Sequence, residues 1–118
     1  MKLKLPGEGC LLRIFIGETD NYKGIALYEK IVMKAREMNL AGATVIRGIM
    51  GFGASSRMHS AKLLRLSEDL PVIVEIVDTE ENINKLMPFL DENVTEGLIT
   101  LEKVQIIKYR DSSKQKSD

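Results

Sequence analysis

The order in which strand-like and helix-like segments follow one another constrains this fold more than any other feature of the sequence. Runs of apolar and β-branched residues, typical of strands, occupy residues 11–16, 43–50, 72–77 and 99–109. Between them, apolar residues recur every three or four positions near 25–39 and near 80–95, which predicts two amphipathic helices. The expected order is therefore strand, helix, strand, strand, helix, strand.

This order predicts an α+β protein of the ferredoxin-like βαββαβ type, in which two helices cover one face of a four-stranded antiparallel sheet. At 118 residues, the chain has the length of one domain. We predict an N-terminal extension over residues 1–9, a single domain over 10–110 and a disordered tail over 111–118.

Three residues suggest how the second helix begins and bends. Asp78 and Glu81 have the spacing of a capping box, so we expect the helix to start there. Pro88 lies inside the same apolar pattern. Because proline removes a backbone donor and crowds the preceding turn, we expect a kink at this position.

The charge balance and the single cysteine narrow the classes of partner. Lys+Arg and Asp+Glu number 17 each, so no net charge favours nucleic acid or a membrane surface. No apolar run approaches about 18 residues, and the first ten residues lack the apolar core of a signal peptide, so we expect no membrane insertion. Cys10 alone can form neither an intrachain disulfide nor a cysteine-cluster zinc site, and the chain is predicted to be cytoplasmic.

The sheet face opposite the helices is expected to be too apolar for water. Both 11–16 and 72–77 carry large apolar residues on each face, with only Arg13 and Glu75 as charges on the second face. Soluble monomers rarely expose apolar patches of more than a few hundred Å². The loop and the last strand could cover this face, but we favour burial against other copies of the chain in a closed ring.

The segment GFGASSRMHSAK, residues 51–62, directly follows the second strand and is either a plain connection or a binding loop. Its glycines allow a close backbone approach, and amides in a glycine-rich turn can form a nest for an anion. Neither a Walker A loop nor a GxGxxG motif is present, so composition alone leaves both interpretations open. The binding interpretation selects these residues: Gly51, Phe52, Gly53, Arg57, His59, Lys62 and Arg65.

Three longer phrases favour the binding interpretation. LRIFIGETD, GATVIRGIMGFGASSR and LPVIVEIVD resemble the PII-like signal-transduction superfamily, and most specifically its domain-of-unknown-function family 190. The resemblance covers residues 10–109. It implies the ferredoxin-like fold, a homotrimer whose sheets face the threefold axis, and a mobile effector loop at 53–66 that contacts a target protein.

The sequence departs from PII proteins at three places. Residues 53–71 contain no tyrosine that could be uridylylated. The stretch 95–103 keeps Gly97 and a lysine but lacks the Gly-Asp-Gly cradle for ATP phosphates, so the resemblance implies an adenine nucleotide only as a candidate ligand. Of the arginine pair after the last strand, Arg110 remains, and we add it to the ligand-binding set.

We predict a regulatory or sensor protein, not an enzyme, that binds a small anionic metabolite or nucleotide at clefts between subunits. Catalysis needs a nucleophile or base with a positioned partner, and nothing in the sequence pairs the single histidine, His59, with Cys10. We therefore predict no catalytic residue and no metal ligands. The alternatives are a metal-binding trimer, like the copper-tolerance relatives that share this fold, and an enzyme with an unrecognised site between subunits.

Overall fold

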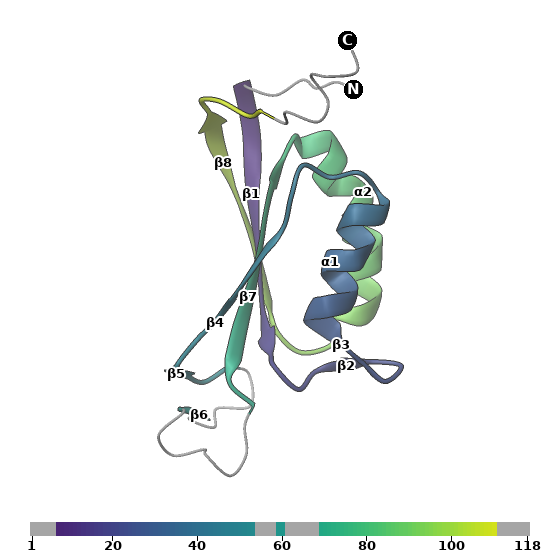
Figure 1. Ribbon diagram of the computed structural model, residues 1–118, viewed down its shortest axis with the longest axis vertical. Helices are drawn as coiled ribbons and strands as arrows, with labels where there is room; N and C mark the ends of the chain where they lie inside the picture. The colour runs from purple at the N-terminus through teal and green to yellow at the C-terminus, as the bar shows by residue number, and fades with distance from the viewer. Residues whose placement is uncertain (1–6, 54–58, 61–68, 111–118) are drawn as a thin grey trace.

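The computed structural model describes residues 7–53, 59–60 and 69–110 (Figure 1). The main sheet contains β1 (Gly7–Gly17), β4 (Thr44–Arg47), β7 (Pro71–Asp78) and β8 (Leu98–Ile106). The helices are α1 (Leu27–Glu37) and α2 (Glu80–Asn93). The described ranges also contain two short strand pairs: β2 (Asn21–Tyr22) with β3 (Ile25–Ala26), and β5 (Met50–Gly51) with β6 (His59–Ser60).

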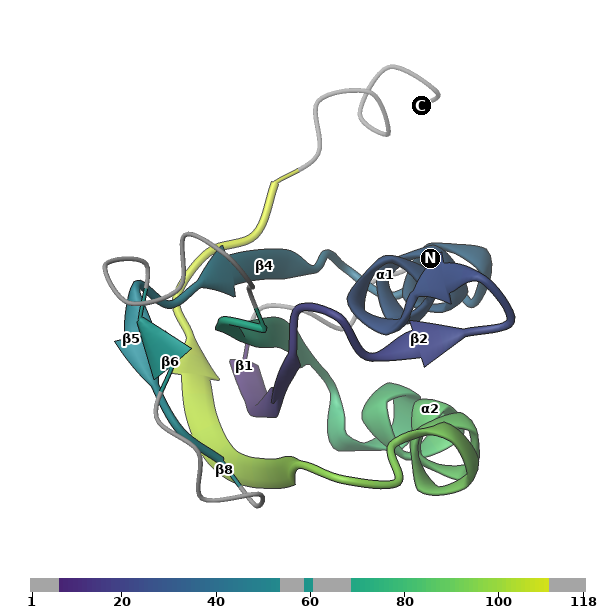
Figure 2. The same cartoon turned by 90° about the horizontal axis from the view of Figure 1, so that it is seen from below.

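The four long strands form an antiparallel sheet in the order β4-β7-β1-β8, and both helices pack on one face of it (Figure 2). This arrangement confirms the predicted α+β architecture. The predicted tail at 111–118 lies outside the described residues. Neither described helix is long and apolar enough to cross a membrane.

The core lies between the helices and the inner face of the sheet. Alternation along β1 and β7 places every second side chain in it, as the sequence predicts. The core side chains of these two strands are Leu12, Ile14, Ile16, Val72, Val74 and Ile76, and those of the helices include Leu27, Ile31, Ile83, Leu86 and Leu90. All of them are buried, so this layer accounts for the packing of both helices on the sheet.

Several strand boundaries differ from those expected. The predicted strand 43–50 is interrupted after Arg47. The amide of Gly48 still donates to the carbonyl of Pro71 at 2.7 Å, in register with the β4–β7 pairing, but Pro71 has no N–H to donate in return, and the chain then turns into β5. The first strand is longer than 11–16 and begins at Gly7. The last strand ends at Ile106 rather than Tyr109, whose hydroxyl instead donates to the carbonyl of Ala41 at 3.1 Å.

The start of α2 corrects the capping-box prediction. Thr79, not Asp78, is the N-cap, and its side chain accepts from the amide of Asn82 at 3.2 Å. The carboxylate of Asp78 is buried and accepts from the amides of Thr79 and Ala41 and from the side-chain amide of Asn82. Asp78 therefore ties the start of α2 to the loop before β4. Pro88 lies inside α2 without ending it, and a kink there stays a prediction.

The face of the sheet opposite the helices carries partly exposed apolar side chains. Ile46 on β4 and Leu98 on β8 are 43% and 57% exposed, and Val77 on β7 is 37% exposed. Phe15 and Ile73, in the centre of the sheet, are half-buried. We refer to this surface, formed by the outward residues of β4, β7, β1 and β8, as the open face.

Candidate functional site

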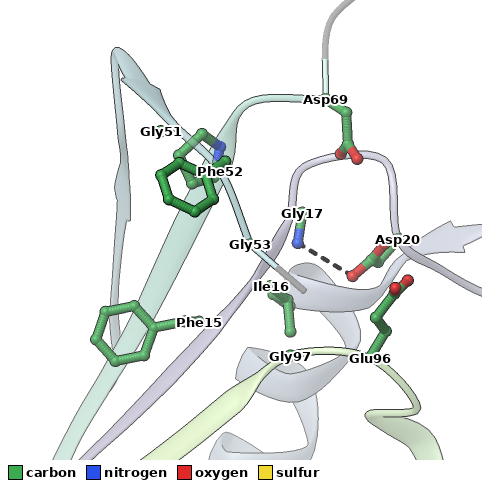
Figure 3. A pocket seen from close by; sticks show the side chains of 11 residues that line it. Phe15, Ile16, Gly17, Asp20, Gly51, Phe52, Gly53, Asp69, Glu96 and Gly97 are labelled. Carbon is green, nitrogen blue, oxygen red and sulfur yellow. Dashed lines mark hydrogen bonds between the residues drawn. The ribbon is translucent and has the colours of Figure 1, made fainter. Parts of the chain in front are cut away.

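A cavity of about 140 Å³ lies at the end of the sheet where β1 ends and β7 begins (Figure 3). Four segments that are far apart in the sequence meet there. They are the end of β1 with the turn that follows, β5 with the two residues after it, the entry to β7, and the turn before β8. The lining residues are Phe15, Ile16, Gly17, Asp20, Gly51, Phe52, Gly53, Asp69, Pro71, Glu96 and Gly97.

Close backbone approach shapes one wall of this cavity. A Cβ atom on Gly97 would lie 2.6 Å from the carbonyl oxygen of Phe15 and 3.1 Å from Cγ2 of Ile16. Backbone atoms cannot move aside cheaply, so only glycine fits at this position. The glycine brings the turn before β8 against the end of β1.

Two carboxylates hold the turn that follows β1. Oδ2 of Asp20 accepts from the amide of Gly17 at 3.0 Å, and Oδ1 of Asp69 accepts from the amide of Thr19 at 3.0 Å. The amide of Glu18 also donates to the carbonyl of Leu70 at 2.8 Å. These bonds fix the end of β1 to the entry of β7, and each uses one oxygen of its carboxylate.

The electrostatic character of the described lining is acidic. Asp20, Asp69 and Glu96 contribute carboxylates, and Figure 3 shows the Glu96 side chain directed toward Asp20. The described lining contains no lysine or arginine. An anionic group in this cavity therefore needs cations from outside this lining to offset the repulsion.

An exposed aromatic ring lines the same cavity, across from the acidic groups (Figure 3). Phe52 is 66% exposed and directly follows β5. Aromatic rings favour offset stacking on other π-systems, so this ring can contact a flat ligand. The carboxylate oxygens nearby can accept hydrogen bonds from N–H groups of such a ligand.

The structure brings only some of the sequence-predicted site residues together. Gly51, Phe52 and Gly53 line the cavity. The backbone of His59 lies opposite Gly51 in the β5–β6 pair, and its side chain is not among the described groups. The remaining predicted loop residues lie outside the described ranges, and they are Arg57, Lys62 and Arg65.

Arg110 lies far from the cavity within the same chain. It follows β8 at the end where Ile106 pairs with Gly7, whereas the cavity lies at Gly17, the other end of β1. Eleven extended residues span roughly 33 Å. Within one copy of the chain, Arg110 and the Gly51–Gly53 segment are therefore too far apart to contact the same small ligand.

Sequence analysis missed Asp20, Asp69 and Glu96 as lining residues. No spacing in the sequence links them, because the strand register brings them together: Gly17 pairs with Pro71, and Phe15 pairs with Leu98. The one available signal was Gly97, which the resemblance places in the turn before the last strand.

The described residues offer no arrangement typical of metal binding. No group of three or more histidine, cysteine, aspartate or glutamate side chains among them is placed to hold an ion. Cys10 is buried and pairs with Asp78, toward the end of β1 away from the cavity. The backbone of His59 lies near the cavity end instead, so the fold separates the two residues.

Solved structures with the same fold come from PII-like proteins. A structure of CPII bound to ADP and bicarbonate, from Thiomonas intermedia K12, matches with a TM-score of 0.64 and 17% identity, covering 87% of this chain and 95% of that chain. The Bacillus subtilis GlnK–ATP complex matches with a TM-score of 0.53 and 11% identity, covering 85% and 84% of the two chains. At these identities the likeness shows the fold, and it confirms the PII-like fold prediction.

Relatives with higher identity extend along most of the chain. A UPF0166 protein of Aquifex aeolicus is 43% identical over 99 residues, which cover 82% of this chain and 91% of the relative. A UPF0166 protein of Methanocaldococcus jannaschii is 37% identical over 99 residues, covering 83% and 91%. The family model of DUF190, described as "Uncharacterized ACR", matches residues 9–106. The chain therefore belongs to the DUF190 family.

Proposed function

We propose that this chain is a PII-like regulatory protein that binds a small anionic metabolite or nucleotide between the subunits of a homotrimer. In this proposal, ligand binding is signalled to a target protein through residues 53–66. The observation that carries it is the position of the cavity: in a PII-like fold, the cavity lies where the chain enters and leaves the 53–66 segment, between Gly51–Gly53 and Asp69.

The size of the cavity supports a site that a second subunit completes. Pockets that enclose a small molecule usually measure about 300–1,000 Å³. The cavity of a single chain measures about 140 Å³, so it can hold only part of a nucleotide. The rest of the ligand would contact a neighbouring copy.

The acidic lining means that an anionic ligand in this cavity would depend on cations from outside it. Phosphates or a carboxylate placed near Asp20, Asp69 and Glu96 need nearby cations. In the proposed site, Arg57, Lys62 and Arg65 provide them from the same chain, and Arg110 provides one from a neighbouring subunit. Within one chain, Arg110 lies at the end of the sheet away from the cavity, so only the Arg110 of a neighbouring subunit could contact the ligand.

A nucleotide fits the remaining chemistry of the cavity. The exposed ring of Phe52 can stack on a base, and the carboxylates can accept hydrogen bonds from an exocyclic amino group. The structural neighbours contain such ligands, namely ADP with bicarbonate in CPII and ATP in GlnK. We therefore propose an adenine nucleotide as the first candidate ligand and bicarbonate as the second.

A regulatory role fits these residues better than catalysis. A nucleophile needs a base within hydrogen-bonding reach, and Cys10 is buried toward the other end of the sheet. Two of the three carboxylates that line the cavity, Asp20 and Asp69, hold a backbone turn. Their structural role is sufficient to explain them.

A thermal-shift screen tests this function. ADP, ATP, AMP and bicarbonate would each be added to the purified protein, with Zn²⁺ and Cu²⁺ as separate arms. We expect a nucleotide to raise the Tm progressively with concentration, because it binds only the folded protein. Stabilisation by metal ions alone would instead support a metal-binding trimer.

A matched pair of variants locates the binding site. Phe52→Ala removes the exposed ring at the cavity, whereas Ile49→Ala shortens a side chain that is 80% exposed and does not line the cavity. We expect the nucleotide-induced shift to fall in the first variant and to persist in the second. An equal shift in both variants would place the ligand elsewhere.

A further inference from the structure

The outward side chains of the open face are arranged in rows that cross the sheet. The first row, nearest the cavity, is apolar and crosses all four strands: Ile46, Ile73, Phe15 and Leu98. The second row is polar: Thr44, Glu75, Arg13 and Thr100. The third row contains Val77, Leu11 and Glu102. A polar row thus separates two rows that are mainly apolar.

Arg13 organises the charges of this surface. Its Nε donates to Oε2 of Glu75 at 2.9 Å within the polar row. Its Nη1 lies 3.5 Å from Oε1 of Glu102, in the next row. The side chains of Arg13 and Glu75 are only 36% and 29% exposed even in the isolated chain. We call Arg13, Glu75 and Glu102 the charged belt.

We propose that the charged belt sets the register in which copies of this chain pack their open faces together. The inference rests on the homotrimer of the proposed function and adds the residues that determine how its subunits align. The occupant of the open face is another copy of the chain, because the face carries both charge signs between apolar rows. A copy of the same surface therefore offers apolar groups to apolar groups and carboxylates to the guanidinium.

The spacing of the rows explains how the belt specifies one alignment. Successive rows are two residues apart along a strand, or roughly 6.6 Å. A slip by one row would place Arg13 and Glu75 of one subunit against the Ile73 and Phe15 row of the next. The pair within each chain would persist, but apolar side chains would then cover it and could not satisfy its remaining donors and acceptors, which is unfavourable, whereas apolar rows alone would tolerate such a slip. A polar group inside an apolar interface can specify register in this way.

A set of three variants tests the belt by native mass spectrometry, with circular dichroism to verify folding. Glu75→Gln keeps the shape of the side chain but leaves Arg13 with its weaker contact to Glu102. We expect the protein concentration at which the trimer dissociates to rise more than about tenfold. The reversed belt, Arg13→Glu with Glu75→Arg and Glu102→Arg, keeps an opposite charge at each contact of residue 13, and we expect it to recover a single trimeric species.

The apolar double variant Arg13→Leu with Glu75→Leu separates register from affinity. It removes the two more buried charges of the belt together and leaves only Glu102, whose side chain is 60% exposed in the isolated chain, so we expect strong association but a mixture of stoichiometries instead of one trimer. A uniform trimer in this double variant, identical to wild type, would overturn the inference while leaving the proposed trimer intact. A monomeric wild-type protein would overturn the trimer itself, and with it the role of the belt.

Discussion

At two single residues, Asp78 and Gly97, the surrounding structure requires a particular residue type. Asp78 is 2% exposed, and its carboxylate accepts from the amide of Ala41 at 2.7 Å and from the side chain of Asn82 at 2.9 Å. Gly97 lies against backbone at the cavity wall. Asp78 stabilises the fold away from the cavity, whereas Gly97 allows the close packing that forms one wall of the cavity.

Replacing Asp78 with alanine should lower the free energy of unfolding by about 3 kcal/mol, because partly buried donors lose their acceptor. Chemical denaturation would measure the loss. Thr79→Ala is the matched control at the neighbouring N-cap and should cost only about 1 kcal/mol. Equal losses in both variants would mean that Asp78 adds no more than an ordinary cap.

Replacing Gly97 with alanine should destabilise the protein by about 1–3 kcal/mol, since the new Cβ would overlap the carbonyl oxygen of Phe15. Gly42→Ala is the control, because a Cβ there meets no atom within 4 Å. We expect the control to stay within about ±0.5 kcal/mol in the same denaturation experiment. A tolerated alanine at Gly97 would show that the cavity wall can move.

Among the elements, α2 contains an apparent conflict between sequence and structure. Pro88 lies within the helix, so the carbonyl of Asn84 has no amide donor one turn later. Pro88→Ala restores that donor on an exposed helix surface, and we expect the free energy of unfolding to rise by about 1 kcal/mol or more. Lys85→Ala, also exposed, is the control and should change stability by less than about 0.5 kcal/mol. A loss of stability in Pro88→Ala would show that the packing of α2 depends on the proline.

The long elements could be predicted from sequence because their patterns are strong. Alternation in 11–16 and 72–77 correctly assigned the buried and outward side chains of β1 and β7. The two-residue strands β2, β3, β5 and β6 were missed, since two residues show no periodicity. The cap shifted from Asp78 to Thr79 because a buried tertiary bond to Ala41 occupies the aspartate.

The candidate site was only partly predictable for a different physical reason. Gly51–Gly53 stood out by composition, and they do line the cavity. Asp20, Asp69 and Glu96 carry no local signal, because strand register brings their segments together only in the folded chain. The predicted cations Arg57, Lys62 and Arg65 lie outside the described residues and stay a prediction, while the acidic character of the described lining was not anticipated.

For the whole molecule, the proposed trimer predicts that copies of the chain meet through the open face. Ile73→Glu places a charge in the middle of the apolar row, where burial in an assembly would be costly. We expect this variant to fold but to scatter light as a monomer. Met33→Glu on α1, at a side chain 47% exposed, is the control and should keep the wild-type mass. An Ile73→Glu variant with the wild-type mass would show that copies do not meet through this face.

Native mass spectrometry of the wild-type protein with ADP tests the central proposal most directly, because one spectrum reports both assembly and ligand. We expect a species of three times the 13.2 kDa chain mass that carries up to three ADP molecules, one for each cleft between subunits. A monomer of 13.2 kDa, or a trimer that remains without ADP at saturating concentration, would contradict an adenine-nucleotide sensor built from three copies of this chain.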